Sequence, residues 1–333
     1  MDSSQYPNRI SHAQAAGLLK RAGRVLICGH INPDGDCIGS MAALAHAMRS
    51  MGKTARAVLV SELPLKYRFV ADMFTKPDAE FCSTADLVAV LDTPSRSRLE
   101  IPADMLPAGK PVVCIDHHPV TLKDFNYVLE DRCEAAAGCI LYEVFRELGV
   151  GITPAMADCL YAALITDTGR FTNRNTSARV FELALNLVNA GADPFRIAGY
   201  IYQSATVAQL RLLGAVLETL ELVSGERGAI LYLTDSMRRE CDAEEADTEN
   251  FVNYARSIHG VETAALLSEE PGCQSVKISL RSNTSAYDVS ALAGRYGGGG
   301  HPGASGATVS GSLGSVLPEF KSRYEQFIQG IEK

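Results

Sequence analysis

The chain has 333 residues, of which 47% are hydrophobic and 21% charged, and it carries a formal net charge of −8 with a pI near 5.4. This composition can bury a sizeable core and supply two domains, and it excludes a disordered chain. The acidic balance also excludes a long basic groove that would neutralise many backbone phosphates, while a short or singly phosphorylated substrate remains compatible with it.

The amino-terminal segment and the cysteines predict a soluble, cytoplasmic protein. Residues 1–14 show no basic start followed by an apolar run, and no stretch approaches the roughly 20 apolar residues of a membrane span. We therefore expect no association with a membrane. The nine cysteines stand mostly inside apolar runs and form no CxxC pair, which predicts buried thiols rather than disulfides or structural zinc.

The first part of the chain alternates between predicted helices and apolar, β-branched strands. In chain order we expect a helix near 11–22, a strand at 24–29, a helix at 38–51 and strands at 54–60, 87–91 and 112–115. Strands of this kind separated by helices are typical of a parallel sheet that is covered on both faces. The predicted fold class is therefore α/β.

Helices dominate the middle of the chain, and a mixed pattern follows. Helices are predicted at 135–148, 154–165, 176–189, 194–202 and 207–222. Beyond residue 224 we expect strands at 229–234, 263–267 and 276–280, with helices at 250–258, 289–296 and 316–328. The simplest organisation is a catalytic domain over 1–190, a helical linker over 191–225 and a smaller mixed α/β domain over 226–333.

Acidic and imidazole side chains gather where the predicted strands end. Ligands of open α/β sheets bind at the carboxyl ends of the strands, so loops from residues 30 to 167 are expected to converge on one crevice. Taken singly, an aspartate after a strand usually caps a helix or forms a turn, and a lone histidine is usually a satisfied polar group. The set comprises His30, Asp34, Asp36, Asp92, Asp116, His117, His118 and Asp167.

So many carboxylates in one crevice would repel one another and lose hydration, which makes divalent cations their natural partners. A carboxylate-rich set with imidazoles suits Mn²⁺, with Mg²⁺ or Co²⁺ as alternatives, better than a metal that prefers thiolates. Two ions about 3.5–4 Å apart that share a carboxylate and a hydroxide would bring the pKa of the water towards about 7 and hold a phosphoryl group for in-line attack.

Four segments resemble the motifs of the DHH-DHHA1 phosphoesterases, namely HINPDGDCIGS, LDTPSRSRL, IDHHP and LITDTGRF. The likeness extends to SLRSN and GGGGHPGASGA near the end of the chain, so it covers essentially all of it. It implies that two metal ions are held by His30, Asp34, Asp36, Asp92, His117 and Asp167. It also implies that Asp92 bridges the ions, that His118 contacts the scissile phosphate and that Asp116 orients the ligands.

A glycine run, Gly297–Gly300 followed by His301, marks a second candidate site. Its backbone can approach an anion closely, although such a run is otherwise typical of a flexible turn. The family resemblance implies that this part of the DHHA1 domain binds substrate through Arg281, Ser282, Gly298, Gly299, Gly300 and His301. Pro302, Gly303 and Ser305 do not match the family strictly, which leaves base recognition open.

Among these phosphoesterases the chain is similar to the compact nanoRNase and phosphoadenosine-phosphate phosphatase type. The resemblance implies hydrolysis of short oligoribonucleotides to mononucleotides, and of 3′-phosphoadenosine 5′-phosphate to AMP, by two-metal hydroxide attack. Hydrolysis of cyclic dinucleotides or their linear products such as pApA, and a non-catalytic nucleotide sensor, remain as alternatives. The sequence leaves the oligomeric state open, with a homodimer among the options.

Overall fold

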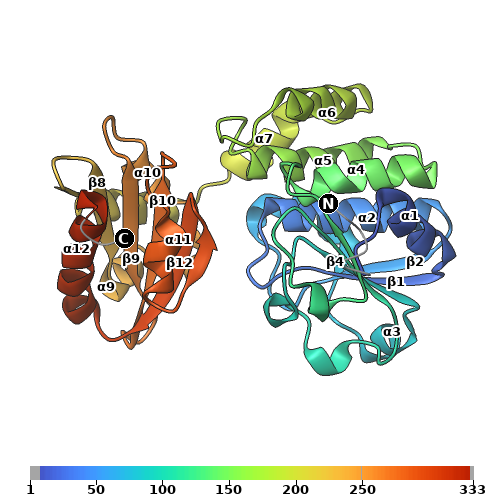
Figure 1. Cartoon of the computed structure of the whole chain (residues 1–333), viewed down its shortest axis with the longest axis horizontal. Coiled ribbons are helices and arrows are strands. Elements are labelled where there is room, and N and C mark those ends of the chain that lie inside the picture. Colours follow the sequence, from blue (N-terminus) through green and yellow to red (C-terminus); the bar gives the residue numbers. More distant parts are fainter. Residues whose placement is uncertain (1–7, 249, 331–333) are drawn as a thin grey trace. The chain divides into compact units, whose positions relative to one another are not determined.

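The computed structural model describes residues 8–248 and 250–330, and the chain divides into two compact units between Ser204 and Ala205 (Figure 1). This boundary lies inside the segment 191–225 predicted to be a linker. The helix α7 (Pro194–Tyr202) therefore belongs to the first unit and α8 (Val207–Leu217) to the second. Among the described residues, no helix is both long enough and apolar enough to span a bilayer.

The first unit is built on a six-stranded, fully parallel sheet with the order β3-β2-β1-β4-β5-β6. Successive side chains of its central strands enter two different cores, with Val25 and Ile27 on one face and Leu26 and Cys28 on the other. Burial on both faces confirms the predicted parallel sheet. Its strands are β1 (Arg24–Cys28), β2 (Thr54–Val58), β3 (Phe74–Thr75), β4 (Leu87–Leu91), β5 (Val112–Asp116) and β6 (Tyr127–Glu130).

Four helices cover one face of this sheet, α6 and α7 pack outside them, and α3 lies on the opposite face (Figure 1). Short 3-10 segments occupy Leu65–Met73, Arg96–Arg98, Ala103–Met105 and Leu122–Asp124. The helices are α1 (His12–Arg21), α2 (Gly35–Ser50), α3 (Ala79–Thr84), α4 (Ala137–Leu148), α5 (Pro154–Asp167) and α6 (Ala178–Asn189).

The helices α2 and α5 approach each other closely because small residues face one another. A Cβ added at Gly39 of α2 would overlap the carbonyl oxygen of Cys159 and come within 3.0 Å of the amide nitrogen of Ala163, both in α5. Helix α2 begins at Gly35, three residues before the predicted start. The side chain of Asp34 caps it by accepting hydrogen bonds from the amides of Asp36 and Cys37, both at 3.1 Å.

The strand order reverses between β1 and β4, since the chain runs from β1 outwards to β3 and then returns to the other side of β1. Loops that leave two neighbouring strands in opposite directions open a crevice at their carboxyl ends. His30 follows β1 and Asp92 follows β4, so both lie at this point.

The second unit contains a six-stranded mixed sheet with the order β11-β12-β10-β9-β8-β7, in which only β8 and β9 pair in parallel. Helices α11 (Val289–Gly294) and α12 (Leu313–Gln329) cover one face, while α8, α9 (Asp235–Glu240) and α10 (Val252–Arg256) cover the other. A 3-10 turn spans Glu245–Thr248. The strands are β7 (Glu221–Val223), β8 (Gly228–Leu233), β9 (Thr263–Glu269), β10 (Ser275–Ser282), β11 (Gly299–His301) and β12 (Ala304–Ser310).

Candidate metal centre

The eight side chains predicted to converge do lie together, at the carboxyl edge of the first sheet. Asp92 follows β4, and its backbone adopts a left-handed conformation with a φ of 51°, which is uncommon for a residue other than glycine. The other positions are the loop after β1 for His30, the cap and first turn of α2 for Asp34 and Asp36, the end of β5 for Asp116, His117 and His118, and the end of α5 for Asp167.

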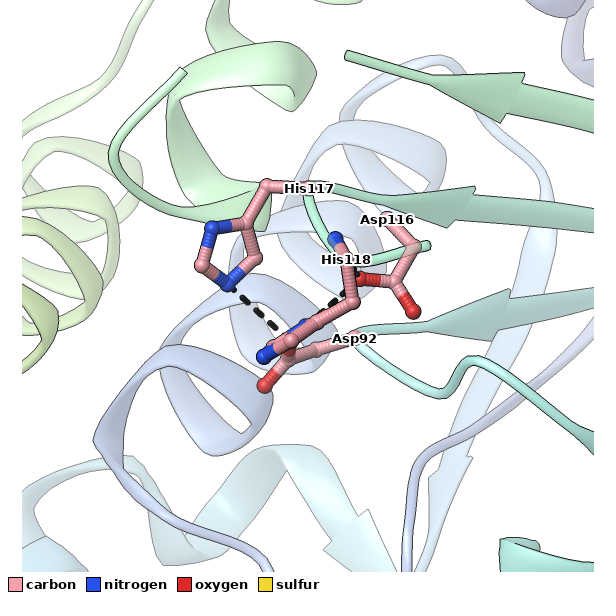
Figure 2. Close-up of side chains that lie close together, drawn as sticks. All are labelled: Asp92, Asp116, His117 and His118. Atoms are coloured by element: carbon pink, nitrogen blue, oxygen red, sulfur yellow. Dashed lines mark hydrogen bonds and ion pairs between the residues drawn. The ribbon is translucent and has the colours of Figure 1, made fainter. Parts of the chain in front are cut away.

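Asp92 stands at the middle of the cluster. Its Oδ2 lies 3.5 Å from Nε2 of His30. Its Oδ1 lies 3.6 Å from Nε2 of His117 and 3.2 Å from Nδ1 of His118, and Figure 2 shows these two histidines beside it. The two oxygens of one carboxylate therefore face imidazoles that belong to different loops. Oδ1 is buried and accepts no hydrogen bond from the described residues.

A second group of ligand atoms surrounds His117. Its Nε2 lies 3.8 Å from Oδ2 of Asp36 and 3.5 Å from Oδ2 of Asp167. The candidate ligand atoms of these three residues lie within 4.8 Å of one another, as do those of His30, Cys37 and Asp92. His30 also lies 4.0 Å from Oδ1 of Asp34. The geometry thus offers two groups of donors on either side of Asp92.

Backbone amides of α4 fix the carboxylate of Asp36. Ala137 donates to Oδ2 at 2.6 Å and Gly138 to Oδ1 at 3.0 Å, and the hydroxyl of Ser40 donates to Oδ1 at 2.9 Å. A Cβ added at Gly138 would lie 2.7 Å from that of Ala163, so the close approach requires glycine. The sequence analysis missed both Ser40 and Gly138. Ser40 lies four residues after Asp36 in the same helix, so helical spacing could have indicated it. Gly138 lies about one hundred positions after Asp36, and no local pattern marks its amide.

Asp116 orients His118. Its Oδ1 accepts hydrogen bonds from both the backbone amide of His118 at 2.7 Å and the ring Nδ1 at 2.8 Å. When Nδ1 carries the proton of that bond, Nε2 is the nitrogen that remains for another partner. The rings of His117 and His118 meet edge to face, with centroids 4.1 Å apart.

Glu130 anchors the loop that follows His118, and the sequence analysis missed it as well. It ends β6 opposite Asp116 in the strand register, and its side chain is only 2% exposed. Its Oε2 accepts a hydrogen bond from the amide of Val120 at 3.1 Å. This amide is the first backbone donor after His118, because Pro119 has no N–H group. Oε1 accepts hydrogen bonds from Nη2 of Arg9 at 3.2 Å and Nε of Arg132 at 2.6 Å.

The pKa values of the side chains in the cluster are shifted by burial and by the neighbouring charges. Burial, followed by repulsion from Asp92, raises the pKa of Asp36 well above its usual range, and burial with repulsion from Asp34 raises the pKa of Asp167 likewise. Burial also acts against ionisation of Asp92, but its imidazole neighbours outweigh it and hold the pKa of Asp92 below its usual range. Burial opposes protonation of His118, yet Asp116 and Asp92 raise the pKa of its imidazole to about 11.

These features fit a divalent metal ion. Oδ1 of Asp92 and Oδ2 of Asp116 are buried and accept no hydrogen bond within the described ranges, and buried acceptors without a donor are rare. The donors are carboxylate oxygens and imidazole nitrogens, which suit Mn²⁺ and related divalent cations. The first unit can therefore hold a metal centre whose ligands are carboxylates and imidazoles.

In the second unit, β12 brings the two parts of the predicted substrate site into register. Arg281 of β10 and His301 of β11 both pair with Ala304, one on each side, so the three side chains share one face of the sheet. A Cβ added at Gly298 would overlap the carbonyl oxygen of Gly306. The amide of Ser282 donates to the carbonyl of Gly303 at 3.0 Å. Within the glycine run, Gly299 and Gly300 belong to the short edge strand β11.

Comparisons with known proteins agree with this division. Residues 24–164 match the DHH family, N-terminal domain, and residues 227–330 match the DHHA1 domain. The bifunctional oligoribonuclease and PAP phosphatase NrnA of Thermus thermophilus is 29% identical over 313 residues, which span 93% of this chain and 90% of that protein. Its namesake in Bacillus subtilis is 24% identical over 290 residues, with 86% and 89% coverage.

Solved structures of similar fold are also known. An exopolyphosphatase-related protein from Bacteroides fragilis superposes with a TM-score of 0.87 at 25% identity and covers 96% of this chain and 97% of its own. The exonuclease RecJ bound to manganese reaches a TM-score of 0.54 at 16% identity, with 96% and 94% coverage, which shows a shared fold.

Proposed function

The chain belongs to the DHH-DHHA1 phosphoesterases, and from this premise we propose that it hydrolyses short oligoribonucleotides to mononucleotides and 3′-phosphoadenosine 5′-phosphate to AMP. Relatives that match the chain over about nine-tenths of their own length are named bifunctional oligoribonuclease and PAP phosphatase, which supports this choice of substrates.

The observation that carries the proposal is the position of Asp92 between two groups of donors. One group is formed by His30, Asp34 and Asp92, and the other by Asp36, His117, Asp167 and Asp92. Each oxygen of Asp92 faces a different group, as expected of a carboxylate that bridges two cations. Two divalent ions, when bound, would activate a water molecule and neutralise charge on the phosphoryl group. Mn²⁺ is our choice of ion, from the donor set.

We assign the remaining polar groups of the centre to positioning and charge stabilisation. His118, held at Nδ1 by Asp116, would donate from Nε2 to a phosphoryl oxygen as negative charge develops there. The amides of Ala137 and Gly138 keep Asp36 in one orientation, which removes the cost of reordering that carboxylate during turnover. In the second unit, Arg281, Ser282, His301 and the glycines 298–300 would bind the part of the substrate that does not react.

The direct test is to incubate the purified protein and Mn²⁺ with the linear diadenylate pApA and, separately, with 3′-phosphoadenosine 5′-phosphate. We expect AMP from both, and a chelator should abolish its formation. Folded, metal-loaded protein that releases no AMP from either substrate would contradict the proposal. Hydrolysis confined to a cyclic dinucleotide would replace it with the cyclic dinucleotide phosphodiesterase alternative.

The second unit's part can be tested at Arg281. Replacement by alanine removes a planar donor suited to phosphate, so KM for pApA should rise about tenfold or more while kcat changes less. Lys277 is the matched control, because it lies four residues earlier on the same face of β10 and pairs with Glu245 at 3.4 Å. An unchanged KM in the Arg281 variant would remove this residue from the substrate site.

Glu130 is expected to influence the centre without touching it. Replacing it with alanine frees the amide of Val120 and should weaken Mn²⁺ binding and lower kcat by roughly 10- to 100-fold. Mn²⁺ affinity, measured by calorimetry, separates this effect from catalysis.

A matched control for this variant exists in Asp158. Asp158 is also a buried carboxylate, and it accepts hydrogen bonds from the backbone amide of Asp193 at 3.0 Å and from the side chain of Arg196. These contacts join α5 to α7 and lie outside the metal centre. The alanine variants of Glu130 and Asp158 should both lower Tm, and only the former should change Mn²⁺ affinity. Equal effects on affinity would reduce Glu130 to a stability role.

A further inference from the structure

The outer face of α6 is apolar although it lies on the surface. Three of its side chains point into the core beside α5, and its four polar side chains form one stripe at a spacing of three, four and three residues. The rest of the helix surface is apolar. The inward residues are Val180, Leu183 and Leu187, the polar stripe is Arg179, Glu182, Asn186 and Asn189, and the outer stripe is Phe181, Leu185 and Val188. A helix with so narrow a polar stripe is typical of a buried helix.

The exposure of this outer stripe is large. Phe181 is 56% exposed, Leu185 59% and Val188 41%, and Phe195 in the first turn of α7 is 85% exposed. With about 150–200 Å² for each fully exposed large side chain, these four leave roughly 360–480 Å² of apolar surface. Phe181 also stacks on Phe171, with ring centroids 5.4 Å apart, so the surface continues to the loop that follows Asp167.

We propose that the outer stripe of α6, Phe181, Leu185 and Val188, together with Phe195 of the following helix, binds the same residues of a second copy of the chain. A standard interface buries about 800 Å² per partner, of which about 450–520 Å² is apolar, and these four side chains alone supply most of that apolar area. The inference rests on the first unit alone and does not depend on the proposed activity.

The spacing of the stripe favours a helix as the partner element. Phe181, Leu185 and Val188 follow the four-three spacing of a seam between two packed helices. In a two-fold symmetric, antiparallel pair whose axis passes beside Leu185, midway between positions 184 and 185, the large Phe181 of one copy lies opposite the smaller Val188 of the other. The surface is therefore complementary to itself in size.

The charges near the surface disfavour a lipid bilayer as the occupant. Amphipathic helices that lie on membranes carry several Lys or Arg on their polar face. The polar stripe of α6 holds a single basic residue, Arg179, and its guanidinium already pairs with Glu134 at 2.5 Å and Glu143 at 2.9 Å.

Sedimentation velocity of the whole chain between about 1 and 50 µM tests the proposal. The wild type should sediment as a dimer of twice 35.7 kDa. Leu185→Glu places two carboxylates at the two-fold axis and should yield a monomer with unchanged circular dichroism. The matched control is Leu65→Glu, which changes a leucine that is 52% exposed in the 3-10 segment Leu65–Met73 and should stay dimeric.

A milder variant covers the case in which the charged one does not fold. Leu185→Ala keeps a good helix former and should raise the dimer dissociation constant about tenfold or more. A monomeric wild type over the whole concentration range would overturn the proposal. A dimer that neither Leu185 variant weakens would place the interface elsewhere and overturn it as well.

Discussion

Replacing Asp92 with asparagine is expected to lower kcat on pApA by roughly a thousandfold or more, which corresponds to several kcal/mol of transition-state stabilisation. The variant keeps the volume of the side chain, and asparagine tolerates the left-handed backbone at this position. One oxygen of Asp92 lies beside His30 and the other beside His117. Asparagine replaces one of them with an NH₂ group, which cannot bind a cation. Turnover should be measured at saturating Mn²⁺ and substrate.

Asp86 provides the control for this variant, because it lies just before the other end of the same strand, β4. There its Oδ2 accepts hydrogen bonds from the backbone amides of Gly23 at 3.0 Å and Arg24 at 2.8 Å. Because these contacts lie at the opposite end of the strand from the metal centre, Asp86→Asn should retain turnover. If Asp92→Asn kept more than about a tenth of the wild-type kcat with Mn²⁺ bound, Asp92 would not be the bridging residue.

Replacing Asp167 with asparagine should stabilise the protein in a chelator and abolish its response to Mn²⁺. Burial, followed by nearby carboxylates, raises the pKa of Asp167, so its charged form is less favourable in the folded than in the unfolded chain, and neutral asparagine removes that penalty. The gain in Tm should be about 2–4 °C for each kcal/mol of relieved repulsion.

Thermal unfolding with and without Mn²⁺ checks this prediction. Cations at about one hundred times their dissociation constant should stabilise the wild type by about 2.7 kcal/mol, whereas Asp167→Asn should gain little. The surface variant Asp86→Asn should respond as the wild type does. An Asp167→Asn variant that unfolds below the wild type in chelator would show that this carboxylate supports the fold rather than opposing it.

The four central strands of the first sheet could be predicted because they are apolar runs rich in β-branched residues, as at Leu87–Leu91 before Asp92. The sequence analysis did not identify the two edge strands. β3 has only two residues, and β6 (Tyr127–Glu130) is short and ends in the buried charge of Glu130. The helix predicted over 207–222 is wrong in its last turn, because residues 221–223 pair with β8 and no glycine or proline marks the change.

The convergence of the candidate ligands could be predicted because every one lies near the end of a recognisable element. Their support could not, since it depends on groups far apart in the sequence. The amide of Gly138 reaches Asp36 only after α4 has packed beside α2, and Glu130 reaches Val120 only once β6 has paired with β5. Such contacts follow from tertiary packing rather than from local propensity.

The close contact of α2 with α5 at Gly39 determines more than packing. Asp36 stands in the first turn of α2 and Asp167 in the last residue of α5, so the distance between these two carboxylates is fixed by the spacing of two helix axes. Substitution of Gly39 by a larger residue should therefore separate the two helices and enlarge the centre for a bigger cation, with every carboxylate left in place. The selectivity for ion size would then be adjusted by a residue that never meets the ion.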